Sequence, residues 1–229
     1  MSTTILERPA SARPDEEVPL TFGLVLYNGF QALDVFGPID ALNILSFIYP
    51  IKLYVLAESL DPVTTKSPQG FEHPGSDFSQ RILPTHTFES APTFDVLIVP
   101  GGVGNRGPID AALSYIGKVA PEVQYIFTIC TGSGMVARTG FLDGRRATTN
   151  KKAFSRITAL RPQVQWVKRA RWVVDGNIWT ASGVSAGLDA IFAFIREIYG
   201  SEVASLISAF MEYEPHSDPS WDPFAGPDA

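Results

Sequence analysis

The chain has 229 residues, of which 45% are apolar and 18% charged, and its formal net charge is −6. This length and apolar content suffice for one domain with a full core, and the acidic balance argues against a nucleic-acid surface, which needs a basic excess. No apolar run approaches the roughly 18 residues that indicate a membrane span. We expect a disordered extension over 1–19, one domain over 20–213 and a tail over 214–229 that is rich in Pro and Asp.

The first half of the domain alternates between predicted strands and helices. Short apolar runs predict strands at Thr21–Tyr27, Ile51–Ala57, Asp95–Pro100 and Gln124–Ile129. Helical spacing and turn residues predict helices at Val35–Phe47, Pro108–Val119, Gly132–Thr139 and Lys151–Leu160. Between them, Asp61–Thr87 is rich in Pro, Gly, Ser and Thr and predicts loops and short strands.

The second half adds a hairpin and two long helices. Asp175–Gly176 is a hairpin signal between strands expected at Arg171–Val174 and Asn177–Ala181, after a strand at Val164–Val167. Amphipathic helices are expected at Val184–Tyr199 and Glu202–Tyr213. Strands that alternate with helices predict an α/β fold, in which helices cover both faces of a mostly parallel sheet.

Three of the predicted strands end next to residues that can carry chemistry. The first leads to Asp34, the third to Gly101–Gly102 and the fourth to Cys130. Ligands in open α/β sheets bind beyond the carboxyl ends of the strands, so these residues form the candidate site.

Cys130, the single cysteine, cannot form an internal disulfide, which predicts a reducing, cytoplasmic location. The small residues Thr131–Gly134 follow it, as in a strand-to-helix elbow that exposes a nucleophile. The following helix then points its free amides at the sulfur and lowers the pKa of the thiol. The competing interpretation is a small buried hydrophobic residue.

The Gly102 and Thr131 amides and the Asp34 carboxyl each allow a structural and a catalytic interpretation. The backbone amides of Gly102 and Thr131 are candidates for an oxyanion hole, although Gly102 also suits a plain strand end. Asp34 suits an N-cap, but if it faces Cys130 its burial favours the protonated carboxyl of a general acid and base. His73, His86 and His216 lack metal-ligand spacing, so we expect no metal site.

Several motifs together resemble the ThiJ/PfpI superfamily, which is related to class I glutamine amidotransferases. The resemblance covers roughly Thr21 to Tyr213. The matching stretches, in the family's order, are Phe22–Asp40, Val99–Gly102 (VPGG), Ile129–Ser133 (ICTGS), Gly140–Thr149 and Asp175–Asp189. The combination of Leu-Asp-x-x-Gly-Pro with Cys-Thr-Gly is similar to the isonitrile hydratase branch, which hydrates an isonitrile to an N-substituted formamide.

The resemblance implies a flavodoxin-like sandwich, a homodimer and a cofactor-free lyase that acts on a small molecule. It places Cys130, Asp34 and Thr131 on functional positions. Many relatives have histidine after the Ala-Thr-Thr stretch, whereas this chain has Asn150, which cannot take up a proton near neutral pH. We therefore expect Asp34 to transfer protons and Asn150 to act as a binding residue rather than a base.

Two other functions use the same residues. A glyoxalase- or deglycase-like enzyme acting on α-oxoaldehydes would need the same cysteine and acid. A non-enzymatic redox sensor would oxidise an exposed, low-pKa thiol to a sulfinate. Some relatives fuse the domain to a DNA-binding helical module, which we do not expect after Tyr213.

Overall fold

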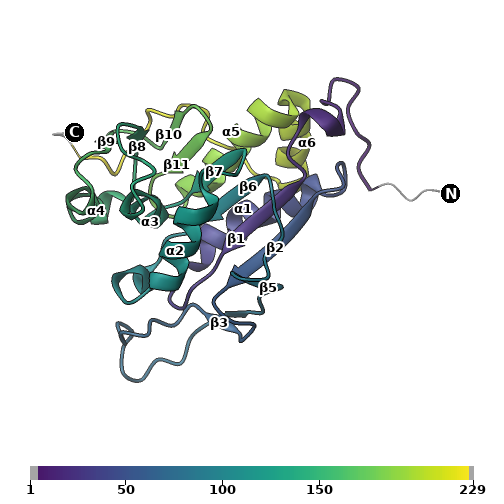
Figure 1. The fold of residues 1–229 in the computed structure, drawn as a ribbon. Helices are drawn as coiled ribbons and strands as arrows, with labels where there is room; N and C mark the ends of the chain where they lie inside the picture. The colour runs from purple at the N-terminus through teal and green to yellow at the C-terminus, as the bar shows by residue number, and fades with distance from the viewer. Residues whose placement is uncertain (1–4, 227–229) are drawn as a thin grey trace.

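A seven-stranded sheet forms the centre of the computed structural model, which describes residues 5–226 (Figure 1). Its order is β10-β11-β7-β6-β1-β2-β5, and every neighbouring pair is parallel except the β10–β11 hairpin. The strands are β1 (Thr21–Val25), β2 (Lys52–Ala57), β5 (His86–Thr87), β6 (Val96–Val99), β7 (Tyr125–Thr128), β10 (Trp172–Asp175) and β11 (Ile178–Ala181). The predicted α/β class with a mostly parallel sheet is confirmed.

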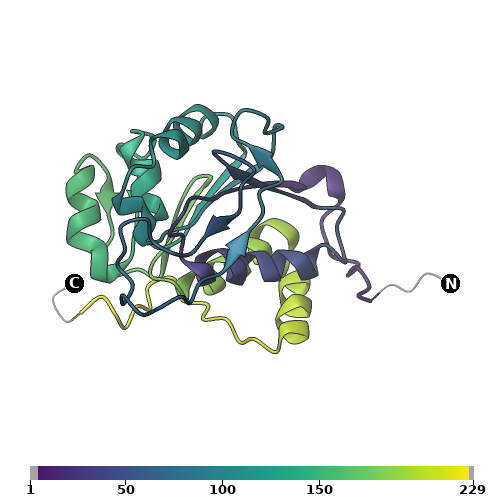
Figure 2. The same ribbon diagram turned by 90° about the horizontal axis from the view of Figure 1, so that it is seen from below.

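Helices cover both faces of this sheet, as Figure 2 shows. One face carries α1 (Ala32–Leu45), α5 (Ala186–Tyr199) and α6 (Ser201–Met211), which also pack against one another. The other face carries α2 (Asp110–Val119) and α3 (Gly132–Arg138), and α4 (Phe154–Leu160) packs against α3. Each layer buries its own apolar cluster, so the sheet is covered on both sides.

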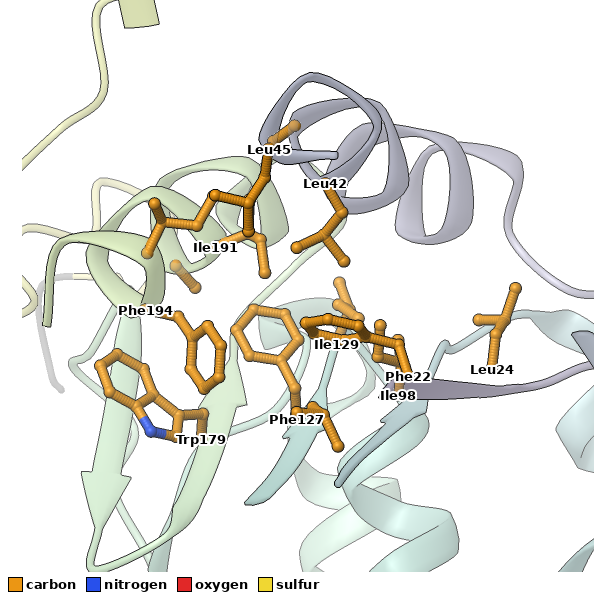
Figure 3. Packing of buried hydrophobic residues seen from close by; sticks show 14 of the residues in the cluster. Phe22, Leu24, Leu42, Leu45, Ile98, Phe127, Ile129, Trp179, Ile191 and Phe194 are labelled. Atoms are coloured by element: carbon orange, nitrogen blue, oxygen red, sulfur yellow. The ribbon is translucent and has the colours of Figure 1, made fainter. Parts of the chain in front are cut away.

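Aromatic side chains fill the core beneath α1 and α5 (Figure 3). The ring of Phe194 meets the rings of Phe127 and Trp179 edge to face, at centroid distances of 5.9 and 5.4 Å. Such arrangements add to the free energy gained from apolar burial. They fix α5 against β7 and β11, the two strands whose ends surround Cys130.

Short elements differ from the predictions because local hydrogen bonding decides their boundaries. The strand expected at Val164–Val167 is β9 (Gln165–Trp166), which pairs with β8 (Arg146–Ala147) outside the main sheet. The helix expected from Lys151 begins as a 3-10 turn, η3 (Lys151–Ala153), which Asn150 caps. The remaining short elements are η1 (Asp15–Glu17), β3 (Val63–Thr64), β4 (Arg81–Ile82) and η2 (Val103–Arg106).

The described part of the N-terminal extension packs against the domain, in contrast to the disorder expected from its composition. The Arg8 guanidinium lies 4.2 Å from the centroid of the Tyr49 ring, and the Tyr49 hydroxyl donates to the carbonyl of Arg13 at 2.9 Å. Residues 1–4 of the extension lie outside the described residues. Across 5–226, no helix is both long enough and apolar enough to cross a bilayer.

Candidate active site

Cys130 lies at a strained elbow between β7 and α3. Its φ of 56° falls in the left-handed region, which costs a non-glycine residue about 1–3 kcal/mol. The Cys130 amide donates to the carbonyl of Ser182 at 2.9 Å, and the Cys130 carbonyl accepts from Thr149 Oγ1 at 2.9 Å. A Cβ at Gly132 would collide with the Val99 carbonyl, which explains the small residue after the elbow. The predicted elbow is therefore present and held from three sides.

Asp34 is completely buried in the first turn of α1 and faces the thiol of Cys130. The N-cap of α1 is Gln31, so the alternative interpretation of Asp34 as the cap is wrong. Oδ2 of Asp34 accepts the Gly101 amide at 2.8 Å, whereas Oδ1 is buried without a hydrogen-bond partner of full geometry. The carboxyl is thus held by one oxygen and keeps the other available for proton exchange.

The pKa values of both groups are shifted upward. Burial raises the pKa of Asp34 to about 7, against the opposing effects of the Gly101 amide and the thiol. Burial also raises the pKa of Cys130 to about 12, and the negative charge of Asp34 adds to this shift. The expectation of a depressed thiol pKa is therefore wrong, because desolvation outweighs the amides at the elbow. At neutral pH the resting pair is a neutral thiol beside a carboxyl near its midpoint.

Three donors surround the sulfur and favour its ionised form. The pKa of Cys130 is lowered by the backbone amides of Thr131 and Val184 and by the side chain of Asn150. Burial and the charge of Asp34 outweigh these donors, so the net shift of this pKa is upward. Asn150 Oδ1 accepts the Ala153 amide at 3.1 Å, so its Nδ2 is the end that can donate to sulfur. Val184 was missed in the sequence, although it follows β11, whose end lies beside the elbow.

Thr131 is locked in place by its hydroxyl. Oγ1 accepts from Asn105 Nδ2 at 2.7 Å and from the Gly102 amide at 3.2 Å, and Asn105 Nδ2 also reaches the Thr131 carbonyl at 3.2 Å. The Gly102 amide, expected in an oxyanion hole, is therefore engaged by Thr131 in this structure. Sequence reasoning also missed Asn105, which carries no motif that marks it.

Lys151 ties together the loops behind the elbow. Its Nζ donates to Thr148 Oγ1 at 2.9 Å and Ser182 Oγ at 2.8 Å, and forms an ion pair with the buried Asp222 at 3.1 Å. Since Asp222 belongs to the C-terminal tail, part of the tail is an integral support of the site. Burial lowers the pKa of Lys151, which Asp222 opposes.

Two cavities lie near the carboxyl edge of the sheet. One of about 240 Å³ is lined by Asn150, Gly183, Val184 and Phe224, and so shares two donors with the thiol. A larger one of about 680 Å³ extends past Tyr27, and Cys130 lines neither of these two cavities. The strained residue and the shifted pKa values, rather than cavity volume, mark the chemical centre.

Comparison with known proteins assigns this arrangement to a family. A family sequence model, described as the DJ-1/PfpI family, matches residues 23–199. The chain belongs to the DJ-1/PfpI family. A solved ThiJ/PfpI family protein from Pseudomonas syringae has a TM-score of 0.72 and 28% identity, covering 93% of this chain and 86% of that one. Drosophila melanogaster DJ-1beta has a TM-score of 0.68 at 18% identity, over 85% of this chain and 98% of that one, and shows the same fold.

Curated proteins that are similar to this chain differ in function. Isonitrile hydratase from Pseudomonas putida is 31% identical over 86% of this chain and 79% of its own length. The HTH-type transcriptional regulator GbdR from Pseudomonas aeruginosa is 27% identical over 88% of this chain, which spans about half (53%) of that regulator. The proteins similar to this chain thus include both an enzyme and a transcriptional regulator.

Proposed function

We propose that this protein is a cofactor-free hydratase that converts isonitriles to N-substituted formamides. The observation that carries the proposal is the pairing of a strained, buried Cys130 with a fully buried Asp34 whose pKa is raised to about 7. This pair can exchange one proton near neutral pH without a metal or histidine. The similarity to the isonitrile hydratase of Pseudomonas putida supports the same reaction.

The first half of the reaction forms a bond to sulfur. Ionised Asp34 takes the proton of the Cys130 thiol as the sulfur attacks the terminal carbon of the isonitrile, R–NC. Asp34 then returns this proton to the same carbon, which gives the covalent thioimidate R–N=CH–S–Cys130. The raised thiol pKa makes this base necessary, because little thiolate exists at rest.

The second half adds water and breaks the bond to sulfur. Asp34 takes a proton from water as the water oxygen attacks the thioimidate carbon, and passes that proton to the substrate nitrogen. The carbon–sulfur bond then breaks, and the sulfur leaves with its electron pair. The proton of the new hydroxyl is transferred to this sulfur, which restores the Cys130 thiol. The sum is R–NC + H₂O → R–NH–CHO, with no net oxidation or reduction.

The donors around the sulfur stabilise the charge that develops in both halves. The amides of Thr131 and Val184 and the Nδ2 group of Asn150 favour the thiolate. Gly102 contributes by orienting the Thr131 hydroxyl. Asn150 thereby takes a binding role at the position where many relatives have histidine.

A substrate comparison tests the proposal. The purified protein is mixed with a simple alkyl isonitrile or with methylglyoxal, beside its Cys130→Ala variant, and products are followed by NMR. We expect formamide from the isonitrile and none from the variant. Turnover of methylglyoxal alone would favour a deglycase-type activity, in line with the 33% identity to a Pyrococcus abyssi deglycase over 45% of this chain.

The raised thiol pKa also bears on the redox-sensor alternative. Peroxide reacts with thiolate, and a thiol with a pKa raised to about 12 supplies little of it at neutral pH. Mild peroxide followed by mass spectrometry should therefore leave Cys130 largely unmodified. The homodimer implied by the resemblance and the cytoplasmic location expected from the single cysteine stay predictions, and sedimentation of the purified protein tests the first.

A further inference from the structure

Lys151 connects the two residues that hold the backbone of Cys130. The Cys130 carbonyl accepts from Thr149 Oγ1, and the Cys130 amide donates to the Ser182 carbonyl, both at 2.9 Å. Lys151 Nζ donates in turn to the Thr149 carbonyl at 3.1 Å and to Ser182 Oγ at 2.8 Å. One ammonium group thus joins the two residues that keep Cys130 at its strained, positive φ.

Asp222 of the C-terminal tail completes this arrangement. Its Oδ2 lies 3.1 Å from Lys151 Nζ and accepts from Ser182 Oγ at 3.3 Å. The side chains of Lys151 and Asp222 are only 6% and 1% exposed, so solvent and salt screen this ion pair little. Removing one partner of a buried pair leaves the other charge uncompensated, which disturbs a structure far more than the loss of an exposed pair. The position of Nζ therefore depends on the tail.

A backbone contact and a second oxygen of Asp222 hold the tail in place beside the pair. The Arg171 amide donates to the Pro219 carbonyl at 2.7 Å, and the Phe224 amide donates to Asp222 Oδ1 at 3.0 Å. The first contact involves no side chain, and an asparagine at 222 can still accept the second through its amide oxygen. Asp222→Asn therefore removes the ion pair while it retains these two contacts of the tail.

The two loops that Lys151 joins also carry donors to the sulfur. Asn150 directly precedes Lys151, and Val184 lies two residues after Ser182. The loops touch beside the thiol, because an added Cβ at Gly183 would lie 3.0 Å from Asn150 Nδ2. A shift of either loop would thus change the donors around the sulfur together with the backbone of the elbow.

We infer that Lys151 and Asp222 are positioning residues for Cys130, and that the docked C-terminal tail holds the thiol in its reactive geometry through this ion pair. The pair acts through Thr149 and Ser182. This inference goes beyond the proposed function, because it concerns the reactivity of the thiol toward any electrophile. Only its consequence for turnover rests on the hydratase reaction.

Alkylation of the single cysteine tests the inference without catalysis. Lys151→Met removes a positive charge and Asp222→Asn a negative one, so a direct electrostatic effect would slow the reaction in the first variant and speed it in the second. Loss of positioning slows both. We expect iodoacetamide at pH 8 to alkylate both variants about tenfold more slowly than wild type, the effect of losing one hydrogen bond to the ionised sulfur. Mass spectrometry measures the rates.

A double variant keeps the test decisive where a single variant does not fold. Replacing a whole buried ion pair by apolar residues often leaves stability unchanged or raises it. Lys151→Met/Asp222→Leu should therefore fold, as checked by circular dichroism and urea denaturation. Its thiol should still be slow, because methionine cannot donate to Thr149 or Ser182. Asp143→Asn, which breaks a surface ion pair with Arg161, is the control and should react as wild type.

The possible contrary results are specific. Opposite changes in Lys151→Met and Asp222→Asn would reveal a direct charge effect and overturn the inference. A double variant that reacts as fast as wild type or faster would overturn it as well, because a purely structural pair would give this result. Failure of iodoacetamide to alkylate wild-type Cys130 would also overturn it, since the docked tail would then not hold a reactive thiol.

Turnover separates failure of this inference from failure of the proposed function. With an isonitrile substrate, kcat should fall about tenfold in Lys151→Met and Asp222→Asn, with a smaller change in KM. Slowed alkylation in these variants of a protein that turns over no isonitrile would uphold the inference and refute the hydratase proposal. Unchanged alkylation and unchanged kcat in variants of an active hydratase would overturn the inference alone.

Discussion

Asp34 and Asp189 are both completely buried, yet their surroundings differ in kind. Asp189 accepts from Arg171 Nε at 2.6 Å, from the Tyr213 hydroxyl at 2.6 Å and from the His216 amide at 3.0 Å. Asp34 accepts one full hydrogen bond, from the Gly101 amide, and has no cation beside it. The Asp189 carboxylate therefore has a cation and hydrogen-bond donors on both of its oxygens, whereas the Asp34 carboxyl has one donor and lies against a thiol.

The difference separates structural burial from catalytic burial. A buried carboxylate that is paired and fully hydrogen-bonded holds elements together, here the residue before β10 with α5 and the tail. A buried carboxylate with an unsatisfied oxygen gains a raised pKa, at about 7 for Asp34, and exchanges protons instead. Substituting asparagine for either residue removes the charge and keeps the shape, which makes the two variants a matched test.

The largest effect is expected from Asp34→Asn on turnover. Asparagine cannot carry the proton between the thiol, water and substrate, so kcat should fall at least about a hundredfold. The fold should persist, because the amide can still accept from Gly101. Turnover of the best substrate and the far-UV spectrum check both points. Wild-type turnover in this variant would remove Asp34 from the mechanism.

Asp189→Asn should show the opposite behaviour. Losing the charge leaves the Arg171 guanidinium buried without its anion, which should lower the free energy of unfolding by about 3 kcal/mol. Urea denaturation measures this loss. Well below the melting temperature, turnover per folded molecule should stay within about threefold of wild type. A catalytic loss equal to that of Asp34→Asn, without a loss of stability, would erase the distinction between the two carboxylates.

The pH dependence of stability sharpens the contrast further. The pKa of Asp34 is about 7 in the folded protein and near 3.8 when unfolded, so the folded state binds the extra proton. The stability from this proton is fully present below about pH 4 and is lost as the pH rises through 7. Between pH 5 and 8, the unfolding free energy of wild type should fall by about 2.5 kcal/mol relative to Asp34→Asn. Parallel curves for the two proteins would contradict the raised pKa.

The fold was predictable because its strands are continuous apolar runs bounded by turn residues. The pattern at Asp95–Pro100, for example, is satisfied by the buried β6. The elbow was predictable from Cys130 and the small residues after it. The sign of the thiol pKa shift was not, because it depends on how deeply α1 and the loop after β11 bury the sulfur. The basic run Lys168-Arg169-Ala-Arg171 is typical of the solvated face of a hairpin, yet Arg171 is buried because it forms an ion pair with Asp189, 18 residues away.

The smallest effect on turnover is expected at Asn150, where a second substitution serves as a matched control. Asn150 caps η3 through Oδ1 and supports the thiolate through its amide, so Asn150→Ala should lower turnover by about tenfold, the loss of one hydrogen bond to a charged atom. Asn150→Asp retains the cap but replaces the donor with a negative charge.

The two variants separate the roles of Asn150, when compared by turnover and by the pH dependence of Cys130 alkylation. If the donor matters, Asn150→Asp should be at least as impaired as Asn150→Ala, and its thiol pKa should rise further because a second carboxylate faces the sulfur. If the cap alone matters, Asn150→Asp should behave as wild type. A loss in Asn150→Ala as large as that in Asp34→Asn would mean that Asn150, not Asp34, is the main partner of Cys130.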